Sequence, residues 1–232
     1  MKGKTIVVTG GFGALGSGVA AAAIDRGASV AALDVASSAP QALADRLGSK
    51  ALLIGGVDLS SPEGAQQAMG AVKANFGRLD ALLNIAGGFQ WEPVEDGKAE
   101  SWDRMFALNL KTALNACKAA LPYLMENGAG RIVNVGAQSA QHAASGFGPY
   151  AASKSAVHRL TESLADELKL KGVTVNAVLP SIIDTAQNRR DIPNADFSRW
   201  VAPADLAAVI LFLASDDAKA VTGALVPVSG RV

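Results

Sequence analysis

Residues 5–18 read Thr5-Ile6-Val7-Val8-Thr9-Gly10-Gly11-Phe12-Gly13-Ala14-Leu15-Gly16-Ser17-Gly18, and this run sets the architecture of the chain. The apolar residues 5–8 are typical of a buried strand, and the glycines after them are typical of a tight turn. No charge occurs from Thr5 to Ile24, and two lysines precede the run, which imitates a signal peptide or a membrane helix. Five glycines argue against both, because glycine weakens a helix by roughly 1 kcal/mol per residue. We therefore expect a strand, a glycine turn and a helix over residues 14–26, with no targeting segment.

Composition limits the class of protein. The chain has 232 residues, of which 50% are hydrophobic and 18% charged, with 21 basic and 21 acidic side chains. This length and apolar content favour one domain over residues 1–232 and exclude a disordered chain. The formal net charge of +0 gives no electrostatic reason to expect nucleic acid or a membrane as a partner. Cys117 has no second cysteine to pair with, and no Cys/His spacing indicates a metal site, so we expect a reducing, cytoplasmic location.

Short β-rich runs alternate with helix-length runs along the whole chain. We predict strands at residues 5–8, 29–33, 51–56, 81–84, 131–135, 173–179 and 224–228. We predict helices near residues 14–26, 41–47, 62–76, 102–125, 150–170 and 203–213. This alternation predicts a doubly wound α/β domain, with a parallel sheet between helices on both faces. Long loops at 87–101 and 181–202 follow the fourth and sixth strands, at the sheet edge where ligands bind in such folds.

The glycine turn has a chemical use. Its spacing is Gly10-x-x-Gly13-x-x-Gly16, directly before a predicted helix. Glycines in such a turn allow a pyrophosphate to approach the amino end of the helix, where free N–H groups and the helix dipole favour anions. Gly10, Gly13, Leu15 and Gly16 are the expected cofactor contacts. The spacing differs from the usual Gly-x-Gly-x-x-Gly, and a glycine-rich turn without a ligand is the alternative.

Two acidic residues extend this hypothesis. Asp34 ends the second predicted strand, where a carboxylate accepts both ribose hydroxyls of NAD and repels the additional phosphate of NADP. No Arg or Lys flanks it, so we predict NAD(H) in preference to NADP(H), with a solvated strand-end carboxylate as the alternative. Asp58 is placed to reach the adenine amino group, and an N-cap or turn residue is its alternative.

A second cluster combines a phenol and an amine. Tyr150 and Lys154 are four residues apart at the start of a predicted helix, with Pro149 just before, so they share one helix face. A free phenol titrates near pH 10, too high for a proton carrier at neutral pH. A neighbouring ammonium, together with the positive nicotinamide of NAD⁺, is expected to lower the pKa of Tyr150. Tyr150 can then exchange a proton with a carbonyl or imine, and a surface pair is the alternative.

Together these residues resemble the short-chain dehydrogenase/reductase family over essentially the whole chain. The matching motifs occur in family order: the glycine turn, Asp34, Asn84-Ile85-Ala86-Gly87, Asn109, the Tyr150/Lys154 pair and Asn176-Ala177-Val178-Leu179-Pro180. The resemblance implies a single Rossmann-type domain with a seven-stranded, mainly parallel sheet in the order 3-2-1-4-5-6-7. It also implies a small-molecule substrate, and a homodimer or homotetramer built on the helices at 102–125 and 150–170.

The same resemblance implies residue roles. Tyr150 is then the acid/base, Lys154 holds the nicotinamide ribose and tunes the tyrosine, and Asn109 anchors a water in the proton relay. Ile183 and Thr185 hold the carboxamide. The remaining implied cofactor contacts are Asn84, Ala86, Gly87 and Pro180.

One catalytic residue of the family is missing. A serine is expected 13 residues before the tyrosine, and this chain has Ala137 there. Losing such a donor commonly raises the barrier by a few kcal/mol. Ser139 or Gln138 replaces it, or the substrate needs less assistance, or the protein is not a catalyst. The glycine that follows Pro180 in the family is also replaced, by Ser181.

These departures resemble the dihydropteridine reductase branch of the family. Four segments are similar to the corresponding segments of that branch: the glycine turn, Gly136-Ala137, Ala86-Gly87-Gly88-Phe89 and residues 184–200. Enzymes of that branch use NADH to reduce quinonoid dihydropterin, a conjugated imine that accepts hydride readily and explains tolerance of an alanine. Asn84 and Asn109 follow the general family instead.

The aromatic residues Phe89, Trp91, Phe147 and Trp200 are expected at the mouth of the site, around a flat or apolar ligand, or else in loop packing. Three hypotheses therefore stand. The first is an NADH-dependent reductase of an electron-poor C=N or C=O substrate that is similar to dihydropteridine reductase. The second is an alcohol, hydroxy-acid or ketone dehydrogenase in which Ser139 or Gln138 replaces the serine. The third is a dinucleotide-binding regulator without turnover.

Overall fold

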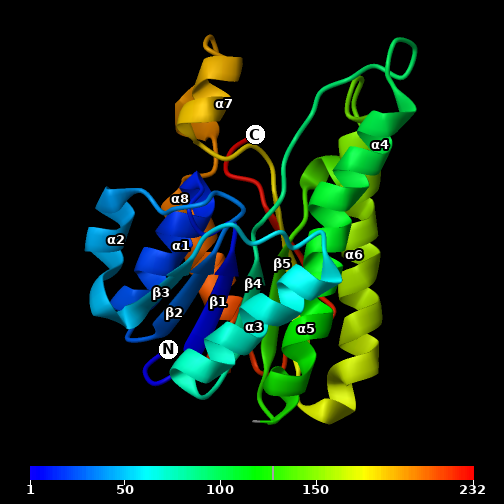
Figure 1. The fold of residues 1–232 in the computed structure, drawn as a ribbon. Helices are drawn as coiled ribbons and strands as arrows, with labels where there is room; N and C mark the ends of the chain where they lie inside the picture. Colours follow the sequence, from blue (N-terminus) through cyan, green and yellow to red (C-terminus); the bar gives the residue numbers. More distant parts are fainter. Residues whose placement is uncertain (127) are drawn as a thin grey trace.

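The computed structural model describes residues 1–126 and 128–232. In this part of the chain seven strands form one sheet in the order β3-β2-β1-β4-β5-β6-β7 (Figure 1). The strands are β1 (Thr5–Thr9), β2 (Ser29–Leu33), β3 (Ala51–Ile54), β4 (Ala81–Asn84), β5 (Arg131–Val135), β6 (Thr174–Pro180) and β7 (Leu225–Val228). Every neighbouring pair is parallel. The predicted strand order is confirmed, and the sheet is parallel throughout rather than mainly parallel.

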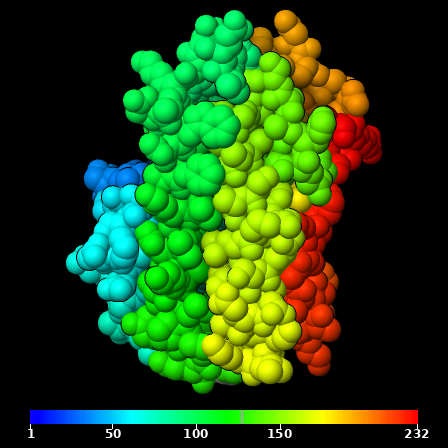
Figure 2. All heavy atoms as spheres, turned by 90° about the vertical axis from the view of Figure 1, so that its right-hand side faces the viewer, coloured from blue at the N-terminus to red at the C-terminus, as the bar shows by residue number. Residues whose placement is uncertain are grey.

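Helices cover both faces of the sheet (Figure 1). They are α1 (Ala14–Asp25), α2 (Gln41–Leu47), α3 (Pro62–Phe76), α4 (Ala99–Met105), α5 (Thr112–Glu126), α6 (Gly148–Leu168), α7 (Ala186–Asp191) and α8 (Pro203–Leu213). Buried side chains of α1, α2 and α8 pack on one face, and those of α3, α5 and α6 pack on the other. α5 and α6 run side by side along the surface shown in Figure 2.

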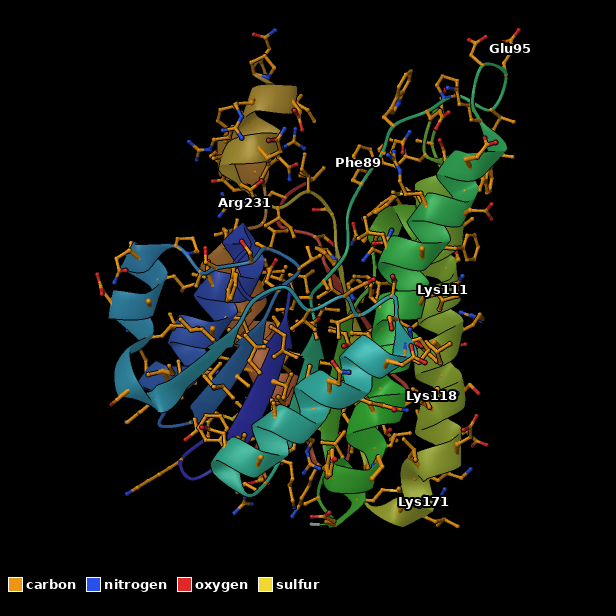
Figure 3. The ribbon with its side chains drawn as sticks, viewed as in Figure 1. Phe89, Glu95, Lys111, Lys118, Lys171 and Arg231 are labelled. Atoms are coloured by element: carbon orange, nitrogen blue, oxygen red, sulfur yellow. The ribbon has the colours of Figure 1, made fainter. Side chains whose placement is uncertain are left out.

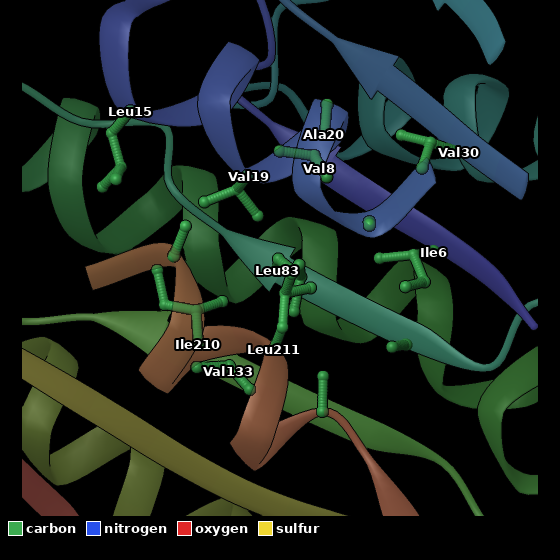
Figure 4. Close-up of a cluster of buried hydrophobic side chains, with 14 of the residues drawn as sticks. Ile6, Val8, Leu15, Val19, Ala20, Val30, Leu83, Val133, Ile210 and Leu211 are labelled. Atoms are coloured by element: carbon green, nitrogen blue, oxygen red, sulfur yellow. The ribbon is translucent and has the colours of Figure 1, made fainter. Parts of the chain in front are cut away.

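The alternation of side chains along β1 explains why its three central residues, Ile6–Val8, are all apolar. Ile6 and Val8 lie in the cluster with Val19 of α1 and Ile210 of α8 (Figure 4). Val7 points the other way, into the cluster with α3, α5 and α6. Successive side chains of a strand face opposite sides of the sheet, so a strand covered on both faces must be apolar at every position.

The prediction of a single continuous helix over residues 102–125 is wrong. The segment begins earlier, as α4 at Ala99, then forms a π-helical stretch over Phe106–Lys111, and continues as α5 to Glu126. A π-helical turn holds an extra residue, which changes the direction of the side chains in it, and such turns are common at functional sites. Asn109 lies within this stretch. Apolar spacing alone did not reveal it, because the residues on either side keep the helical period.

Smaller differences concern element ends and loops. β3 ends at Ile54 rather than at residue 56, and Gly56 has φ +70°, which lies outside the range of a β-strand. α6 begins at Gly148, with Pro149 in its first turn, and ends at Leu168. The predicted loop 181–202 contains α7, whose N-cap is Thr185. Over the residues that are described, every helix is too short or too polar to cross a lipid bilayer.

Candidate active site

The glycine turn joins β1 to α1 at the carboxyl edge of the sheet. Gly10 has φ +63°, and a Cβ there would lie 2.9 Å from the Cα of Ala86, so glycine is required for two reasons. A Cβ on Gly16 would lie 2.1 Å from the Gly10 oxygen. In the described chain no side chain caps α1 at Gly13, and its first turn has no acidic residue. The amino end of α1 is therefore shaped to receive an anion.

A cavity of 590 Å³ opens beside this turn. Predicted cofactor contacts that line it are Gly10, Gly13, Leu15, Gly16, Asp34, Asp58, Ala86 and Gly87. These residues come from the ends of four different strands and from the start of α1. The cavity size, the close-packed glycines and the uncapped helix end fit a dinucleotide.

The two acidic residues of the cavity are held by backbone groups. Asp34 accepts the N–H of Phe12 at 3.0 Å with one carboxylate oxygen and that of Ala36 at 3.0 Å with the other. Asp58 accepts the side-chain O–H of Ser60 at 2.6 Å and its N–H at 2.8 Å, and these bonds lower the pKa of Asp58. Each carboxylate keeps unused acceptor positions, since one oxygen can accept two hydrogen bonds.

The sequence analysis missed one wall of this cavity. Arg104, Ala107, Leu108 and Thr112 line it from α4, the π-helical stretch and the start of α5. Arg104, Leu108 and Thr112 are each four residues apart, a spacing that places side chains on one helix face. That spacing, next to the predicted catalytic residue Asn109, was the feature of the sequence from which this wall of the cavity could have been predicted.

Tyr150 and Lys154 lie in the first half of α6. The Lys154 ammonium is buried and donates a 2.7 Å hydrogen bond to the carbonyl oxygen of Val135, at the end of β5. Burial lowers the pKa of Lys154 to about 8. Burial also raises the pKa of Tyr150 to about 12. The predicted lowering of this pKa included the positive nicotinamide of NAD⁺ as well as the ammonium; in the protein chain by itself desolvation dominates.

Asn109 links the segment after β4 to α6. Its Oδ1 accepts the N–H of Gly88 at 3.0 Å, and its Nδ2 donates to the Gly88 oxygen at 3.1 Å and to Ser153 Oγ at 3.0 Å. Ser153 Oγ in turn donates to the backbone carbonyl oxygen of Tyr150 at 2.8 Å. Gly87 is packed between Asn109 and the Lys154 ammonium, since a Cβ there would lie 2.6 Å and 3.3 Å from them. Asn109 and Lys154 thus both lie against Gly87, and Asn109 is linked through Ser153 to the backbone of Tyr150.

Ala137 is 3% exposed, and its N–H donates to Nε2 of His158 at 3.4 Å. A Cβ on Gly136 would lie 2.5 Å from that nitrogen, so glycine makes room for the buried imidazole. Burial is the main reason that the pKa of His158 falls to about 4. His158 therefore accepts as a neutral ring and holds the backbone at Ala137. Of the two replacement donors, Gln138 uses its amide N–H on Ser229 Oγ, and Ser139 lies in the same short 3₁₀ turn.

The structure brings only some of the predicted aromatic residues together. The Phe89 ring lies 4.9 Å from Tyr150 and 5.1 Å from Phe147, and the Phe147 ring lies 6.3 Å from Tyr150. Figure 3 places Phe89 on the segment that rises from β4 past α4. Trp91 instead donates from Nε1 to the Ser145 oxygen at 3.1 Å. Trp200 belongs to a separate ring pair, 4.8 Å from Phe197.

The other predicted cofactor contacts lie outside the lining of the cavity. Asn84 is buried beneath it and donates to Asn134 Oδ1 at 2.8 Å. Pro180 ends β6, and Ile183 forms a parallel bridge with Val201. Thr185 Oγ1 accepts the N–H of Asn188 at 3.2 Å, so its side chain caps α7.

Comparison with known proteins gives consistent matches. The profile of the short chain dehydrogenase family matches residues 4–195. D-threitol dehydrogenase from Mycolicibacterium smegmatis is 34% identical over 241 residues, which cover 99% of this chain and 93% of that protein. Carveol dehydrogenase from Mycobacterium avium in complex with NAD has a similar structure, with TM-score 0.90 and 26% identity over 99% of this chain and 97% of that one. NAD⁺-bound xylitol dehydrogenase gives TM-score 0.91 and 25% identity over 99% and 98%.

Proposed function

This chain belongs to the short chain dehydrogenase family, and from that premise we propose that it is an NAD(H)-dependent oxidoreductase acting on an electron-poor carbonyl or on the corresponding alcohol. The observation that carries the proposal is the placement of Asn109 and Lys154 against Gly87, which lines the dinucleotide-shaped cavity, with Tyr150 one turn before Lys154 on α6. Relatives named as dehydrogenases of D-threitol, carveol and xylitol support the alcohol–carbonyl pair.

We propose that the amino end of α1 and the glycine turn hold the pyrophosphate of the cofactor. Asp34 holds the ribose of the adenosine half, and Asp58 the adenine. Ala86, Gly87, Pro180, Ile183 and Thr185 lie toward the nicotinamide half, and Asn84 supports Ala86 and Gly87 from below. The nicotinamide supplies or accepts hydride when it is bound.

Tyr150 gives a proton from its Oη to the substrate oxygen during reduction, or removes one during oxidation. The neutral phenol is favoured strongly, because burial raises the pKa of Tyr150 to about 12. Lys154, held by Val135, places a positive charge one helical turn away, and Asn109 fixes the segment that faces both. The structure thereby supports a tyrosine that is neutral at rest and becomes a phenolate only when it has given its proton to the substrate.

Preference for NAD(H) over NADP(H) is part of the proposal. Asp34 lines the cavity, and its carboxylate would repel an additional ribose phosphate. Val35 and Ala36, which follow it, bring no compensating positive charge. An arginine or lysine in their place would have favoured the opposite preference.

We further propose a flat, weakly polar substrate. Phe89 and Phe147 surround the Tyr150 ring, and aromatic rings stack on planar groups. Ala137 offers a methyl group where the family has a hydroxyl, so Tyr150 is left as the main donor to the substrate. A second candidate, an electron-poor C=N group of the dihydropterin type, is favoured by the same alanine, because such a group accepts hydride with less hydrogen-bond assistance.

The test is NADH oxidation with simple ketones, quinones and quinonoid dihydropterin, using wild-type protein and Tyr150→Phe. We expect turnover of at least one class and a loss of about 10²–10⁴-fold in Tyr150→Phe, with unchanged NADH affinity. Tyr123→Phe, which changes the other tyrosine, is the matched control and should retain full activity. Binding of NADH without turnover of any class would favour a regulator, and unchanged turnover in Tyr150→Phe would remove it as the proton donor.

The homodimer or homotetramer implied by the family resemblance stays a prediction. α5 and α6 lie side by side on one surface of the molecule (Figure 2). Analytical ultracentrifugation of the full chain distinguishes a monomer from these assemblies.

A further inference from the structure

Arg104 is the part of the cofactor cavity to which the proposed function gives no role. It lies in the last turn of α4, is exposed, and lines the same cavity as the glycine turn. Among the described residues around this cavity Arg104 is the one cation, whereas Asp34 and Asp58 are acidic. A pyrophosphate entering the cavity brings negative charge, which the carboxylates repel and the guanidinium attracts.

The present partner of Arg104 is one that a phosphate can replace. Its Nη2 donates to Oε1 of Gln90, a single neutral oxygen. A guanidinium instead pairs with a phosphate through two parallel bonds, with opposite charge on both sides. Gln90 is held independently by its own amide, which donates to Glu92 Oε2 at 2.8 Å and to Ser101 Oγ at 3.3 Å. Loss of Arg104 therefore leaves Gln90 with partners.

We propose that Arg104 is a second anion contact of the dinucleotide site, acting from the α4 side of the cavity, and that it exchanges Gln90 for a phosphate oxygen of the bound cofactor. The choice of ligand rests on the proposed function. The contact itself rests on the placement of a lone cation among the described lining residues of a cavity where the uncapped end of α1 also offers backbone N–H groups to anions.

The exchange has a consequence for the substrate side. Gln90 directly follows Phe89, whose ring lies 4.9 Å from Tyr150 (Figure 3). Release of Gln90 by Arg104 removes one of the bonds that fix this segment. Phosphate binding is thereby linked to the freedom of the segment that carries Phe89.

The experiment measures dissociation constants for ADP, adenosine and NADH by calorimetry, with wild-type protein, Arg104→Gln, Gln90→Ala and Lys111→Gln. Lys111 is the matched control, because it is an exposed cation that follows on the same run of helix and does not line the cavity (Figure 3). We expect ADP and NADH to bind about tenfold more weakly to Arg104→Gln, with adenosine unchanged. We expect Gln90→Ala to bind ADP a few-fold more tightly, because Arg104 no longer has to leave a partner. Lys111→Gln should behave as wild type.

Several outcomes would overturn the inference. An equal loss of adenosine and ADP affinity in Arg104→Gln would place its contact on the nucleoside rather than on phosphate. Unchanged ADP affinity in Arg104→Gln would remove the contact, and weaker binding in Gln90→Ala would remove the exchange. If the wild-type protein binds NADH and all the variants have the same dissociation constants as wild type, only this inference is contradicted. A wild-type protein that binds neither ADP nor NADH contradicts the proposed function as well.

Discussion

The ammonium of Lys154 is bonded to the carbonyl oxygen of Val135 at 2.7 Å, so α6 is tied to the end of β5 through a buried charge. The bond fixes the lysine against the sheet one turn beyond Tyr150, where Lys154 is 5% exposed. The position of Lys154 is therefore set by the fold, and keeping its ammonium charged there reduces the free energy of unfolding. This arrangement has a measurable effect on stability.

Lys154 should make the free energy of unfolding depend on alkaline pH. Burial lowers its folded pKa from 10.5 to about 8, so between these values the unfolded chain binds more protons than the folded one. Stability must then rise with pH through this window, and the cost of the buried charge, about 3 kcal/mol, is fully present below pH 8. We expect the difference in unfolding free energy between Lys154→Met and wild type, measured in urea from pH 7 to 10.5, to shrink as pH rises. A difference that is constant with pH would show that the ammonium is not desolvated.

Tyr150 should make alcohol oxidation strongly pH-dependent. Oxidation needs the phenolate, and burial raises the pKa of Tyr150 to about 12, so the phenolate fraction grows about tenfold per pH unit below that value. We expect kcat/KM for alcohol oxidation to rise with pH from 7 to 10, while carbonyl reduction, which uses the neutral phenol, shows no such rise. A plateau of oxidation beginning below pH 8 would mean that bound cofactor and Lys154 together overcome the effect of burial.

Two glycines of α1 provide a matched pair. A Cβ on Gly16 would lie 2.1 Å from the Gly10 oxygen, whereas a Cβ on Gly18 meets nothing within 4 Å. Gly16→Ala should therefore distort the turn and reduce NADH affinity by at least about tenfold. Gly18→Ala should leave NADH affinity unchanged and stabilise the protein by about 0.5–1 kcal/mol through helix propensity. Thermal unfolding and NADH titration of both variants check these outcomes, and equal behaviour of the two would contradict the close packing of the turn.

Asp34 should decide between the two nicotinamide cofactors. Removing its charge in Asp34→Ala removes the repulsion of the additional ribose phosphate and also the ribose contact. The ratio of the NADPH and NADH dissociation constants should therefore fall by at least about tenfold. Asp58→Ala, which changes the carboxylate proposed to face the adenine, should leave that ratio unaltered. Wild-type protein that prefers NADPH would contradict the role given to Asp34.

Ala137→Ser tests the missing hydroxyl. Ala137 is buried, and its backbone is held by His158, so a serine there presents its hydroxyl from a fixed position. We expect carbonyl reduction to become about tenfold faster if no other donor operates. Ser139→Ala is the companion variant. A large loss of activity in Ser139→Ala, with no gain in Ala137→Ser, would identify Ser139 as the replacement donor.

The positions of the strands along the chain and the glycine turn could be predicted because they depend on local pattern, whereas the order of the strands in the sheet was implied only by the family resemblance. Ile6–Val8 of β1 is apolar at every position since helices cover both faces of the sheet, and a glycine at position 10 is needed because the backbone there adopts φ +63°. Neither requirement depends on which distant residue makes the contact. The pairing of Tyr150 with Lys154 on one face of α6 follows in the same way from their spacing.

Packing between distant segments decided the features of the fold and of the site that could not be predicted from the sequence. The π-helical stretch around Asn109 depends on its bonds to Gly88 and Ser153, which come from other elements, and Arg104 reaches the cavity only because of the path that this helix takes. The sequence by itself determined the positions of the strands, the glycine turn and the residues available for proton transfer. Only the tertiary structure decided the direction in which the pKa of Tyr150 moves, because desolvation is set by everything that packs around a group, and no spacing along the chain measures that.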